Sequence, residues 1–129
     1  MARILLIEDD DDLRWALSAV LAKHGHLIVD VAGGDDAIQR FDDAEPDVVI
    51  TDVMMENGNG FEALLKVLDL KRDLPVIVMS GDEGYLKDAS RIGATHTLLK
   101  PFDVDALMTT IDELAEGAGI VGQRAAAFR

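Results

Sequence analysis

Acidic, hydroxyl and amino side chains follow short apolar runs at four places in the chain. Glu8 and Asp9 begin an unbroken run of five acids, Asp52 and Ser80 follow later apolar runs, and Lys100 follows the last one. Carboxylates at contact distance repel one another, so such a cluster is stable when it spreads into water or when a cation lies among the carboxylates. Mg²⁺ prefers oxygen ligands of this kind. Glu8, Asp9 and Asp52 together therefore predict a magnesium site.

The same residues indicate a reaction at phosphorus. A carboxylate such as that of Asp52 can act as a nucleophile and form an aspartyl phosphate. Phosphoryl transfer requires mainly correct positioning and positive charge close to the phosphoryl oxygens. Mg²⁺ and Lys100 would supply that charge, and the hydroxyl of Ser80 would supply a hydrogen bond. This chemistry requires a fold that brings the ends of four apolar runs to one place.

Five short apolar runs divide the sequence, and most of them are continuously apolar rather than alternating. Strands that are buried on both faces, as in a parallel sheet, have this pattern. The runs are Arg3–Ile7, Leu27–Val31, Val48–Ile50, Val76–Met79 and Thr97–Leu99. Between and after them, apolar residues recur at helical spacing in five segments, of which the fourth is the weakest. Strands that alternate with helices predict an α/β fold with a parallel sheet and right-handed crossovers.

Residues that begin and end helices stand where this pattern needs them. Asp11 or Asp12 can cap the first helix, Asp103 can cap the last, and Gly25 and Gly93 suit the ends of the first and fourth helices. In an open parallel sheet, ligands bind beyond the carboxyl ends of the strands. The polar residues that follow the apolar runs are therefore expected to meet at one edge of the sheet.

Length, charge and composition exclude several classes of protein. The 129 residues suggest one domain, which we place at residues 1–116, with a flexible tail at residues 117–129. The net charge of −13 repels phosphate backbones and anionic surfaces, so we expect no direct binding to nucleic acid or to a membrane. No apolar stretch approaches the roughly 20 residues of a membrane span, and the N-terminus lacks the pattern of a secretory signal. The absence of cysteine fits a reducing, cytoplasmic location.

Taken together, these residues resemble the receiver domains of two-component response regulators, the CheY-like proteins. The resemblance runs from residue 3 to about residue 116 and rests on Glu8-Asp9, Asp52, Ser80 and Lys100-Pro101, in this order and at strand ends. It implies a flavodoxin-like (βα)5 fold, a doubly wound parallel sheet with its strands in the order 2-1-3-4-5. It also implies a phosphoacceptor switch rather than an enzyme, in which a phosphohistidine donor transfers its phosphoryl group to Asp52 in the presence of Mg²⁺.

The resemblance assigns the acceptor and the metal ligands. Asp52 would accept the phosphoryl group, Asp9 would bind Mg²⁺ directly, and Glu8 would bind it through water. The backbone carbonyl of Met54, two residues after the acceptor, would be a further ligand.

The resemblance also implies roles for the last strand and for the partners. Lys100 would hold a phosphoryl oxygen, Ser80 would move toward the phosphoryl group in the active state, and the Lys100-Pro101 peptide would be cis. The donor would be a histidine kinase or a phosphotransfer protein. The phosphorylated chain would either switch its binding to a downstream protein, whose identity the sequence does not give, or relay the phosphoryl group. It would act as a monomer or as a dimer that forms on phosphorylation.

Two regions depart from the family pattern. The loop after the acceptor usually carries a proline where this chain has Glu56, and a bulky apolar residue where it has Gly58. We expect this loop to be pliant and to alter Mg²⁺ affinity or the lifetime of the phosphoryl group. Receivers also often use an aromatic residue three positions before the lysine as part of the switch, and here that position is Thr97. Another rearrangement, for example of Tyr85 or of the fourth helix, would then report phosphorylation.

Two other functions stay open beside the switch. Phosphatases of the haloacid dehalogenase type also phosphorylate an aspartate, but they place a second acid where this chain has Met54. A pseudo-receiver, which is an interaction module that works without phosphate, typically lacks the acceptor, the acid pair or the lysine. This chain keeps Asp52, Glu8-Asp9 and Lys100, although the altered loop and the missing aromatic keep this alternative open.

The tryptophan and the three histidines do not predict a further functional site. Trp15 is expected to half-pack against a neighbouring helix, with a partner contact as the alternative. His24, His26 and His96 have no ligand spacing, so we expect them at the surface or at the sheet edge.

Overall fold

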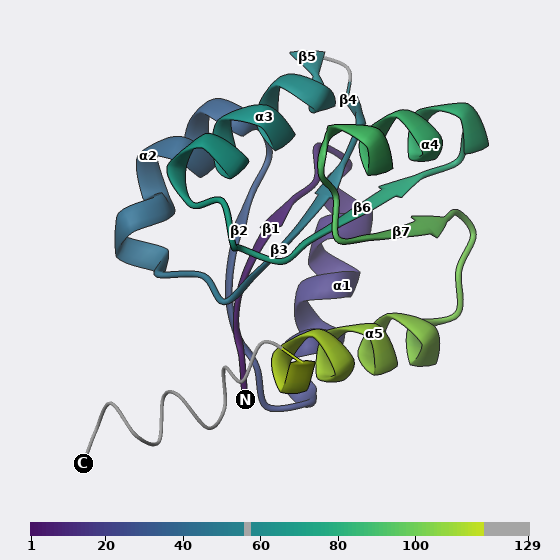
Figure 1. The fold of residues 1–129 in the computed structure, drawn as a ribbon. Helices are drawn as coiled ribbons and strands as arrows, with labels where there is room; N and C mark the ends of the chain where they lie inside the picture. Colours follow the sequence, from purple (N-terminus) through teal and green to yellow (C-terminus); the bar gives the residue numbers. More distant parts are fainter. Residues whose placement is uncertain (56–57, 118–129) are drawn as a thin grey trace.

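The computed structural model describes residues 1–55 and 58–117, and it contains the predicted alternation of strands and helices (Figure 1). In chain order the elements are β1 (Arg3–Ile7), α1 (Asp11–Lys23), β2 (Leu27–Val31), α2 (Gly34–Ala44), β3 (Val48–Asp52), β4 (Met54–Met55), β5 (Gly58–Asn59), α3 (Gly60–Leu70), β6 (Val76–Ser80), α4 (Glu83–Ile92), β7 (His96–Leu99) and α5 (Val104–Gly117). All five predicted strands are present, and three of them are one or two residues longer than the apolar runs indicate.

The main sheet has five parallel strands in the order β2-β1-β3-β6-β7. Because β6 and β7 are the fourth and fifth of the predicted strands, this confirms the order 2-1-3-4-5. The chain moves outward from β1 to β2 and then crosses to β3 on the other side of β1. The strand order therefore reverses between β1 and β3, and the carboxyl ends of these two strands are where such folds bind ligands.

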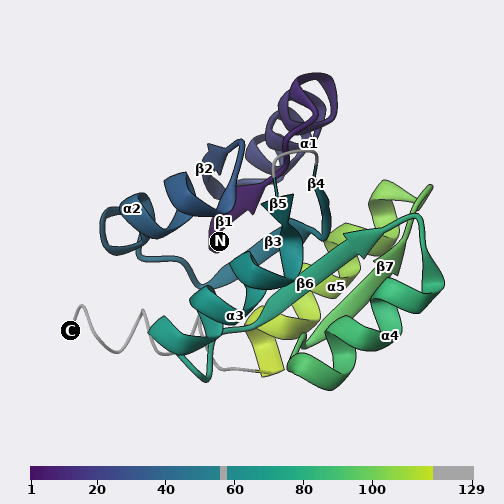
Figure 2. The same cartoon turned by 90° about the horizontal axis from the view of Figure 1, so that it is seen from above.

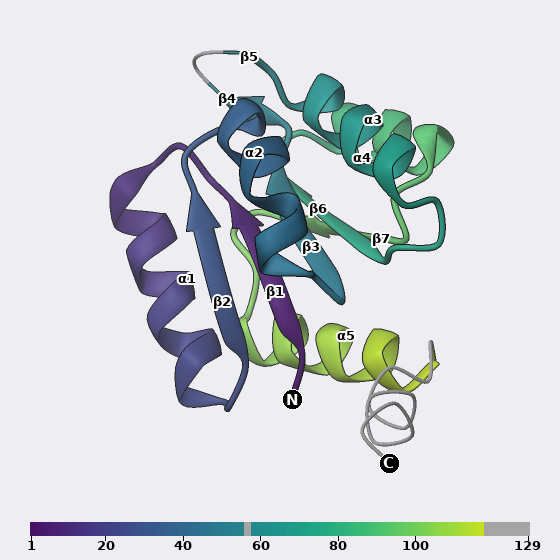
Figure 3. The ribbon, with the colours of Figure 1, turned by 90° about the vertical axis from the view of Figure 1, so that its left-hand side faces the viewer.

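The two faces of the sheet are covered by different helices, as Figures 2 and 3 show. Leu5 and Ile7 of β1 belong to a core with buried residues of α2, α3 and α4, whereas Ile4 and Leu6 belong to a core with α1 and α5. Neighbouring residues of a strand point to opposite faces, so a strand between two helical layers must be apolar throughout. This is the reason for the continuous apolar runs.

The first helix begins one residue earlier than a cap at Asp11 would place it. The carboxylate of Asp10 accepts hydrogen bonds from the amides of Asp12 at 3.0 Å and Leu13 at 3.1 Å, so Asp10 is the N-cap. The prediction that Asp11 or Asp12 caps this helix was wrong, because consecutive aspartates offer equivalent capping side chains. Asp11 and Asp12 lie in the first turn instead, where the helix dipole favours acids.

The other predicted helix ends are confirmed. Gly25 directly follows the C-cap of α1 and Gly93 is the C-cap of α4; both have positive φ angles, of 91° and 136°. Glycine adopts this conformation at little cost. Asp103 precedes α5, and its carboxylate accepts a hydrogen bond from the amide of Asp105 at 2.9 Å.

The expected packing of Trp15 was wrong, since its side chain is 75% exposed. The buried face of α1 is formed by Leu17 and Leu21. Trp15 precedes Leu17 by two residues, which is more than half a helical turn, so it lies on the outer side of the helix.

A short antiparallel pair of strands directly follows the end of β3, and the sequence did not predict it. In this pair Met54 lies opposite Asn59, and Met55 lies opposite Gly58. Glu56, whose effect on the loop is a prediction of the sequence, lies outside the described residues.

The last helix, α5, continues to Gly117, one residue beyond the expected end of the domain at residue 116. Residues 118–129, which make up most of the expected tail, lie outside the described residues. None of the helices in the described part of the chain combines the length and the apolar composition that a membrane span needs.

Candidate functional site

The carboxyl ends of four strands meet at one edge of the sheet and carry the predicted site residues. Parallel pairing aligns β1 with β3, β3 with β6 and β6 with β7, so the last residues of these strands lie side by side. Asp52 and Ser80 end β3 and β6, and Glu8 and Lys100 come directly after β1 and β7. Glu8, Asp52 and Ser80 are 1%, 4% and 0% exposed although all three are polar. Buried polar groups of this kind require partners.

The ammonium group of Lys100 lies between two buried carboxylates. Its Nζ donates a hydrogen bond to Glu8 Oε1 at 3.1 Å and also contacts Asp52 Oδ2. The side chain of Lys100 is 25% exposed, whereas those of Glu8 and Asp52 are almost fully buried. A cation between two carboxylates offsets their mutual repulsion and favours their charged forms. The fold therefore brings three of the predicted site residues into contact, while their roles stay predictions.

Burial and charge shift the pKa values of this cluster. Burial raises the pKa of the Glu8 carboxyl above its ordinary value of 4.5, and the nearby charge of Asp52 adds to this, although hydrogen bonds from Asp10 and Lys100 oppose it. Burial alone would lower the pKa of Lys100, but the hydrogen bonds with Asp52 and Glu8 raise it above its ordinary value of 10.5. Lys100 therefore carries its positive charge at neutral pH.

Glu8 of the acidic pair makes hydrogen bonds on both sides of the turn after β1. The Oε2 atom of Glu8 accepts a hydrogen bond from the amide of Asp10 at 3.2 Å, and its own amide donates to the carbonyl of Val31 at 3.1 Å. Asp9 is half-buried between these two residues. Of the five consecutive acids, Glu8 and Asp9 thus lie at the strand edge, and Asp10 serves the helix.

The predicted magnesium ligands fit the metal by type. Glu8, Asp9 and Asp52 offer carboxylate oxygens, and Met54 offers a backbone carbonyl at the start of β4. Across residues 1–55 and 58–117, however, no three acidic, histidine or cysteine side chains converge closely enough to hold a metal ion. In this arrangement the positive charge between Glu8 and Asp52 is the ammonium of Lys100. The ligand set therefore stays a prediction.

Ser80 connects the strand edge to α4. Its Oγ accepts a hydrogen bond from the amide of Asp82 at 3.0 Å, and Asp82 in turn caps α4 by accepting from the amide of Tyr85 at 3.1 Å. A hydroxyl that accepts one hydrogen bond still has its own proton to donate. Ser80 can therefore donate to an oxygen at the strand edge without leaving Asp82.

The aromatic residue that receivers often use in the switch is absent from β7. An aromatic pair lies elsewhere, between α3 and α4. Thr97 is half-buried in β7. Tyr85 at the start of α4 packs edge to face against Phe61 of α3, with ring centroids 5.7 Å apart and an angle of 82° between the ring planes. The side chain of Tyr85 is 41% exposed. The role that the sequence gave to Tyr85 stays a prediction.

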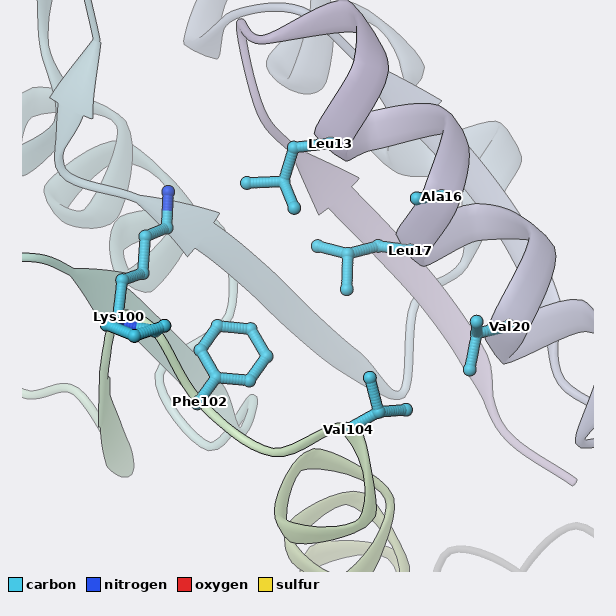
Figure 4. Close-up of a pocket in the computed structure, with 8 residues that line it drawn as sticks. Leu13, Ala16, Leu17, Val20, Lys100, Phe102 and Val104 are labelled. Carbon is cyan, nitrogen blue, oxygen red and sulfur yellow. The ribbon is translucent and has the colours of Figure 1, made fainter.

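An apolar cavity of about 460 Å³ lies beside the candidate site, between α1 and the segment that joins β7 to α5 (Figure 4). The Lys100-Pro101 peptide in this segment is cis, as the resemblance implies. In Figure 4 the Lys100 side chain extends from this segment and Phe102 faces α1. The cavity is lined by Leu13, Ala16, Leu17, Val20, Lys100, Pro101, Phe102 and Val104. Sequence analysis did not predict it, because its lining residues come from both ends of the chain.

Arg14 of α1 is a further residue near the acidic pair that sequence analysis missed. Its guanidinium donates to the backbone carbonyl of Glu8 at 2.7 Å and to Asp11 Oδ1 at 2.5 Å. The spacing of three residues between Asp11 and Arg14 is a signal for such an ion pair on a helix. No sequence pattern indicates the contact with the carbonyl.

Comparison with known proteins gives the family. The family model of the response regulator receiver domain matches residues 4–112. PilH of Pseudomonas aeruginosa is 35% identical over 121 residues, which cover 91% of this chain and 100% of PilH. The regulatory protein AtoC of Escherichia coli is 35% identical over 107 residues, which cover 81% of this chain but only 23% of AtoC. The chain thus corresponds to the whole of one relative and to a part of another.

A solved structure has the same fold and a related sequence. The response regulator TrrA of Thermotoga maritima, determined in complex with Mg(2+)-BeF, is similar with a TM-score of 0.80 and 28% sequence identity. The match covers 88% of this chain and 99% of TrrA.

Proposed function

The chain belongs to the response regulator receiver family of two-component signalling, and we propose that it accepts a phosphoryl group on Asp52 from a phosphohistidine donor. Receivers are phosphoacceptor switches. The observation that carries the proposal is the buried contact of the Lys100 ammonium with both Asp52 and Glu8 at the edge of the sheet. Two carboxyl groups and one lysine are costly to bury for stability alone, and such groups concentrate at functional sites.

In the proposed step, a carboxylate oxygen of Asp52 attacks the phosphorus atom of the donor. The bond between phosphorus and the donor's imidazole nitrogen breaks, and its electron pair stays on that nitrogen. The product is an acyl phosphate on Asp52. The end of β3 holds the attacking carboxylate fixed, and its 4% exposure keeps most water away from the new bond.

Mg²⁺ is the metal that we expect at this edge. Asp9, Asp52 and the backbone carbonyl of Met54 would bind it directly, and Glu8 would bind it through water. When bound, Mg²⁺ supplies positive charge to the phosphoryl oxygens. The complex of the relative TrrA with Mg(2+)-BeF supports this expectation.

Lys100 and Ser80 act on the transferred group in this proposal. The Lys100 ammonium, which now contacts Asp52, would hold a phosphoryl oxygen after transfer. The Ser80 hydroxyl, which keeps a free proton to donate, would bind another. Because the amide of Asp82 donates to Ser80, a movement of Ser80 would reach the N-terminus of α4.

Receivers interact with histidine kinases or phosphotransfer proteins and with downstream targets. For this chain we propose such a donor and a downstream protein partner that recognises the phosphorylated form. A chain whose fold is receiver-like but which works without phosphate, the pseudo-receiver, is the alternative that the experiment must separate.

The test is phosphorylation by acetyl phosphate with and without Mg²⁺, measured as intact mass. The parent protein is expected to gain one phosphoryl group only when Mg²⁺ is present, and Asp52→Asn is expected to gain none. Asp69→Asn, which changes an exposed acid of α3, is the matched control and should behave as the parent. A folded parent that gains no phosphoryl group from acetyl phosphate or from phosphohistidine donors would overturn the proposal and favour the pseudo-receiver.

A further inference from the structure

The guanidinium group of Arg14 joins three segments next to the acidic pair. One terminal nitrogen donates to the backbone carbonyl of Glu8 at 2.7 Å, and the other donates to Asp11 Oδ1 at 2.5 Å. Its Nε lies 3.8 Å from Asp30 Oδ1 on β2. Three nitrogens of one planar group thus face the end of β1, the first turn of α1 and the neighbouring strand β2. The side chain is only 19% exposed, so water competes little for these contacts.

The carbonyl that Arg14 holds belongs to the peptide that connects Glu8 to Asp9. A peptide unit is planar, so fixing its carbonyl oxygen also fixes the direction of the following amide and of the Asp9 Cα atom. The rest of Glu8 is already fixed, because its amide donates to Val31 and its carboxylate accepts from Asp10 and Lys100. The peptide before Asp9 is the part of this turn that Arg14 controls.

The contact also ties the acidic pair to α1. The amide of Arg14 donates to the carbonyl of Asp10 at 2.9 Å, which is the first hydrogen bond of the helix, while its side chain reaches back to Glu8. Arg14 is in addition the first base after five consecutive acids, so its charge reduces their repulsion. Hydrogen bonds from a charged donor are stronger than neutral ones.

We infer that Arg14 is a positioning residue: it orients the Glu8–Asp9 peptide so that the Asp9 carboxylate is directed toward a cation at the edge of the sheet. This inference rests on the proposed function, because it concerns the same site. Arg14 itself does not touch the reacting atoms. Groups that orient metal ligands in this way typically change metal affinity about 10- to 100-fold when they are removed.

Ser18 provides a matched control on the same helix. Its hydroxyl donates to Asp30 Oδ2 at 2.7 Å, so it shares one acid with Arg14 but has no contact with the acidic pair. Ser18→Ala therefore removes a link between α1 and β2 and leaves the Glu8 carbonyl bound. If Arg14 only held α1 to β2, the two variants would behave alike.

The first measurement uses metal-free protein. Hydrogen exchange at the amides of Asp9 and Asp10, followed by NMR in the presence of a chelator, is expected to become faster in Arg14→Gln and to stay at the parent rate in Ser18→Ala. Equal rates in Arg14→Gln and the parent would overturn the inference. This readout does not depend on phosphorylation.

The second measurement is Mg²⁺ affinity by titration calorimetry. Arg14→Gln is expected to bind Mg²⁺ on the order of tenfold to 100-fold more weakly than the parent, and Ser18→Ala to bind it equally well. Arg14→Lys keeps the charge but places its donors on one nitrogen, so we expect only part of the affinity to return. This variant also decides the question if Arg14→Gln does not fold, since parent-like affinity in Arg14→Lys would contradict the inference.

A double-mutant cycle with Asp9→Asn tests whether Arg14 affects Mg²⁺ affinity through Asp9. If Arg14 acts by directing Asp9, removing Arg14 in the Asp9→Asn background should cost little further Mg²⁺ affinity. Additive losses would contradict the inference. A parent that binds Mg²⁺ but is not phosphorylated would overturn the proposed function alone, whereas a parent that binds no Mg²⁺ would overturn both.

Discussion

The two ends of the main sheet both carry charged side chains, but only one end buries them. At the carboxyl end, Glu8 and Asp52 are buried and share the ammonium of Lys100. At the amino end, Arg3 and Glu45 form an ion pair at 3.7 Å whose side chains are 34% and 72% exposed. The first arrangement buries both carboxylates, whereas the second leaves the Glu45 carboxylate mostly exposed and the Arg3 side chain partly exposed.

The polar groups at the amino end have a structural task. The amide of Arg3 donates to Asp47 Oδ2 at 2.8 Å, and the amide of Ala2 donates to His26 Nδ1 at 3.1 Å. These side chains satisfy backbone groups where β1 begins, which is what a buried strand requires. At the carboxyl end, the Lys100 side chain bonds to the side chains of Glu8 and Asp52. The comparison teaches that the acids at the carboxyl end are buried against a shared ammonium, whereas the half-buried Asp47 and His26 at the amino end satisfy backbone amides where β1 begins.

The largest difference between the two ends is expected when the ion pair at each end is broken. Lys100→Met removes the ammonium that two buried carboxylates share, which should lower the free energy of unfolding by about 3 kcal/mol at pH 7 without Mg²⁺. Glu45→Gln, the matched change at the amino end, should lower it by less than about 0.5 kcal/mol, because exposed ion pairs contribute little. Urea unfolding followed by circular dichroism measures both. Equal losses in the two variants would remove the distinction between the two ends.

A smaller effect is expected from the Glu8 carboxyl, as a change in the free energy of unfolding with pH. Its carboxyl has a pKa above its ordinary value of 4.5, because burial disfavours the charged form. Below pH 4.5 it is neutral in both the folded and the unfolded chain. As pH rises through the raised pKa, the folded chain must ionise a buried group, so its free energy of unfolding falls.

Glu8→Gln should lack this fall, so the parent and the variant should differ more at pH 7 than at pH 4.5. Unfolding in urea across this range, with the exposed Glu113→Gln as control, measures the difference. Identical pH dependence of the parent and Glu8→Gln would show that Lys100 compensates the burial of Glu8 completely.

The smallest effect, of opposite sign, is expected from His26 at the amino end. Burial lowers the pKa of His26 below its ordinary value of 6.5, and the N-terminal amino group adds to this, while Asp112 opposes it. Its Nδ1 accepts from the Ala2 amide, which requires that nitrogen to be unprotonated. Above pH 6.5 His26 is neutral in both states, and as pH falls below 6.5 the unfolded chain takes up the proton more readily.

The parent should therefore lose stability on acidification between pH 7.5 and 5.5 relative to His26→Gln, whose side-chain oxygen can still accept from Ala2. The exposed His96→Gln is the control, and chemical unfolding at the two pH values is the measurement. A parent that gains stability relative to His26→Gln over this range would contradict the assigned hydrogen bond.

The fold and the meeting of the site residues could be predicted because both follow from periodicity. Continuous apolar runs that alternate with helical segments predict a parallel sheet, and a parallel sheet brings Glu8, Asp52, Ser80 and Lys100 to one edge. The prediction of the first helix cap was wrong because several neighbouring residues could fill the same role. Asp10, Asp11 and Asp12 can each cap a helix, and only the backbone path selects Asp10.

Other features could not be predicted because they depend on the bonds of single atoms in three dimensions. Arg14 reaches a backbone carbonyl, which leaves no trace in the sequence. The position of Lys100 between two acids follows from side-chain packing, not from spacing. Trp15 was misplaced because an aromatic residue is expected to be buried, whereas its angular position on α1 puts it outside.

The contacts of Lys100 also have a consequence for the order in which the chain is made. Lys100 lies 92 positions after Glu8 and 48 positions after Asp52 in the sequence. A chain that leaves the ribosome therefore presents β1 and β3, with both acids, long before β7. Contacts of such long range form late in folding. Until the last strand arrives, Glu8 and Asp52 lack the ammonium of Lys100, so docking of β7 brings the positive charge that the two acids share in the folded domain.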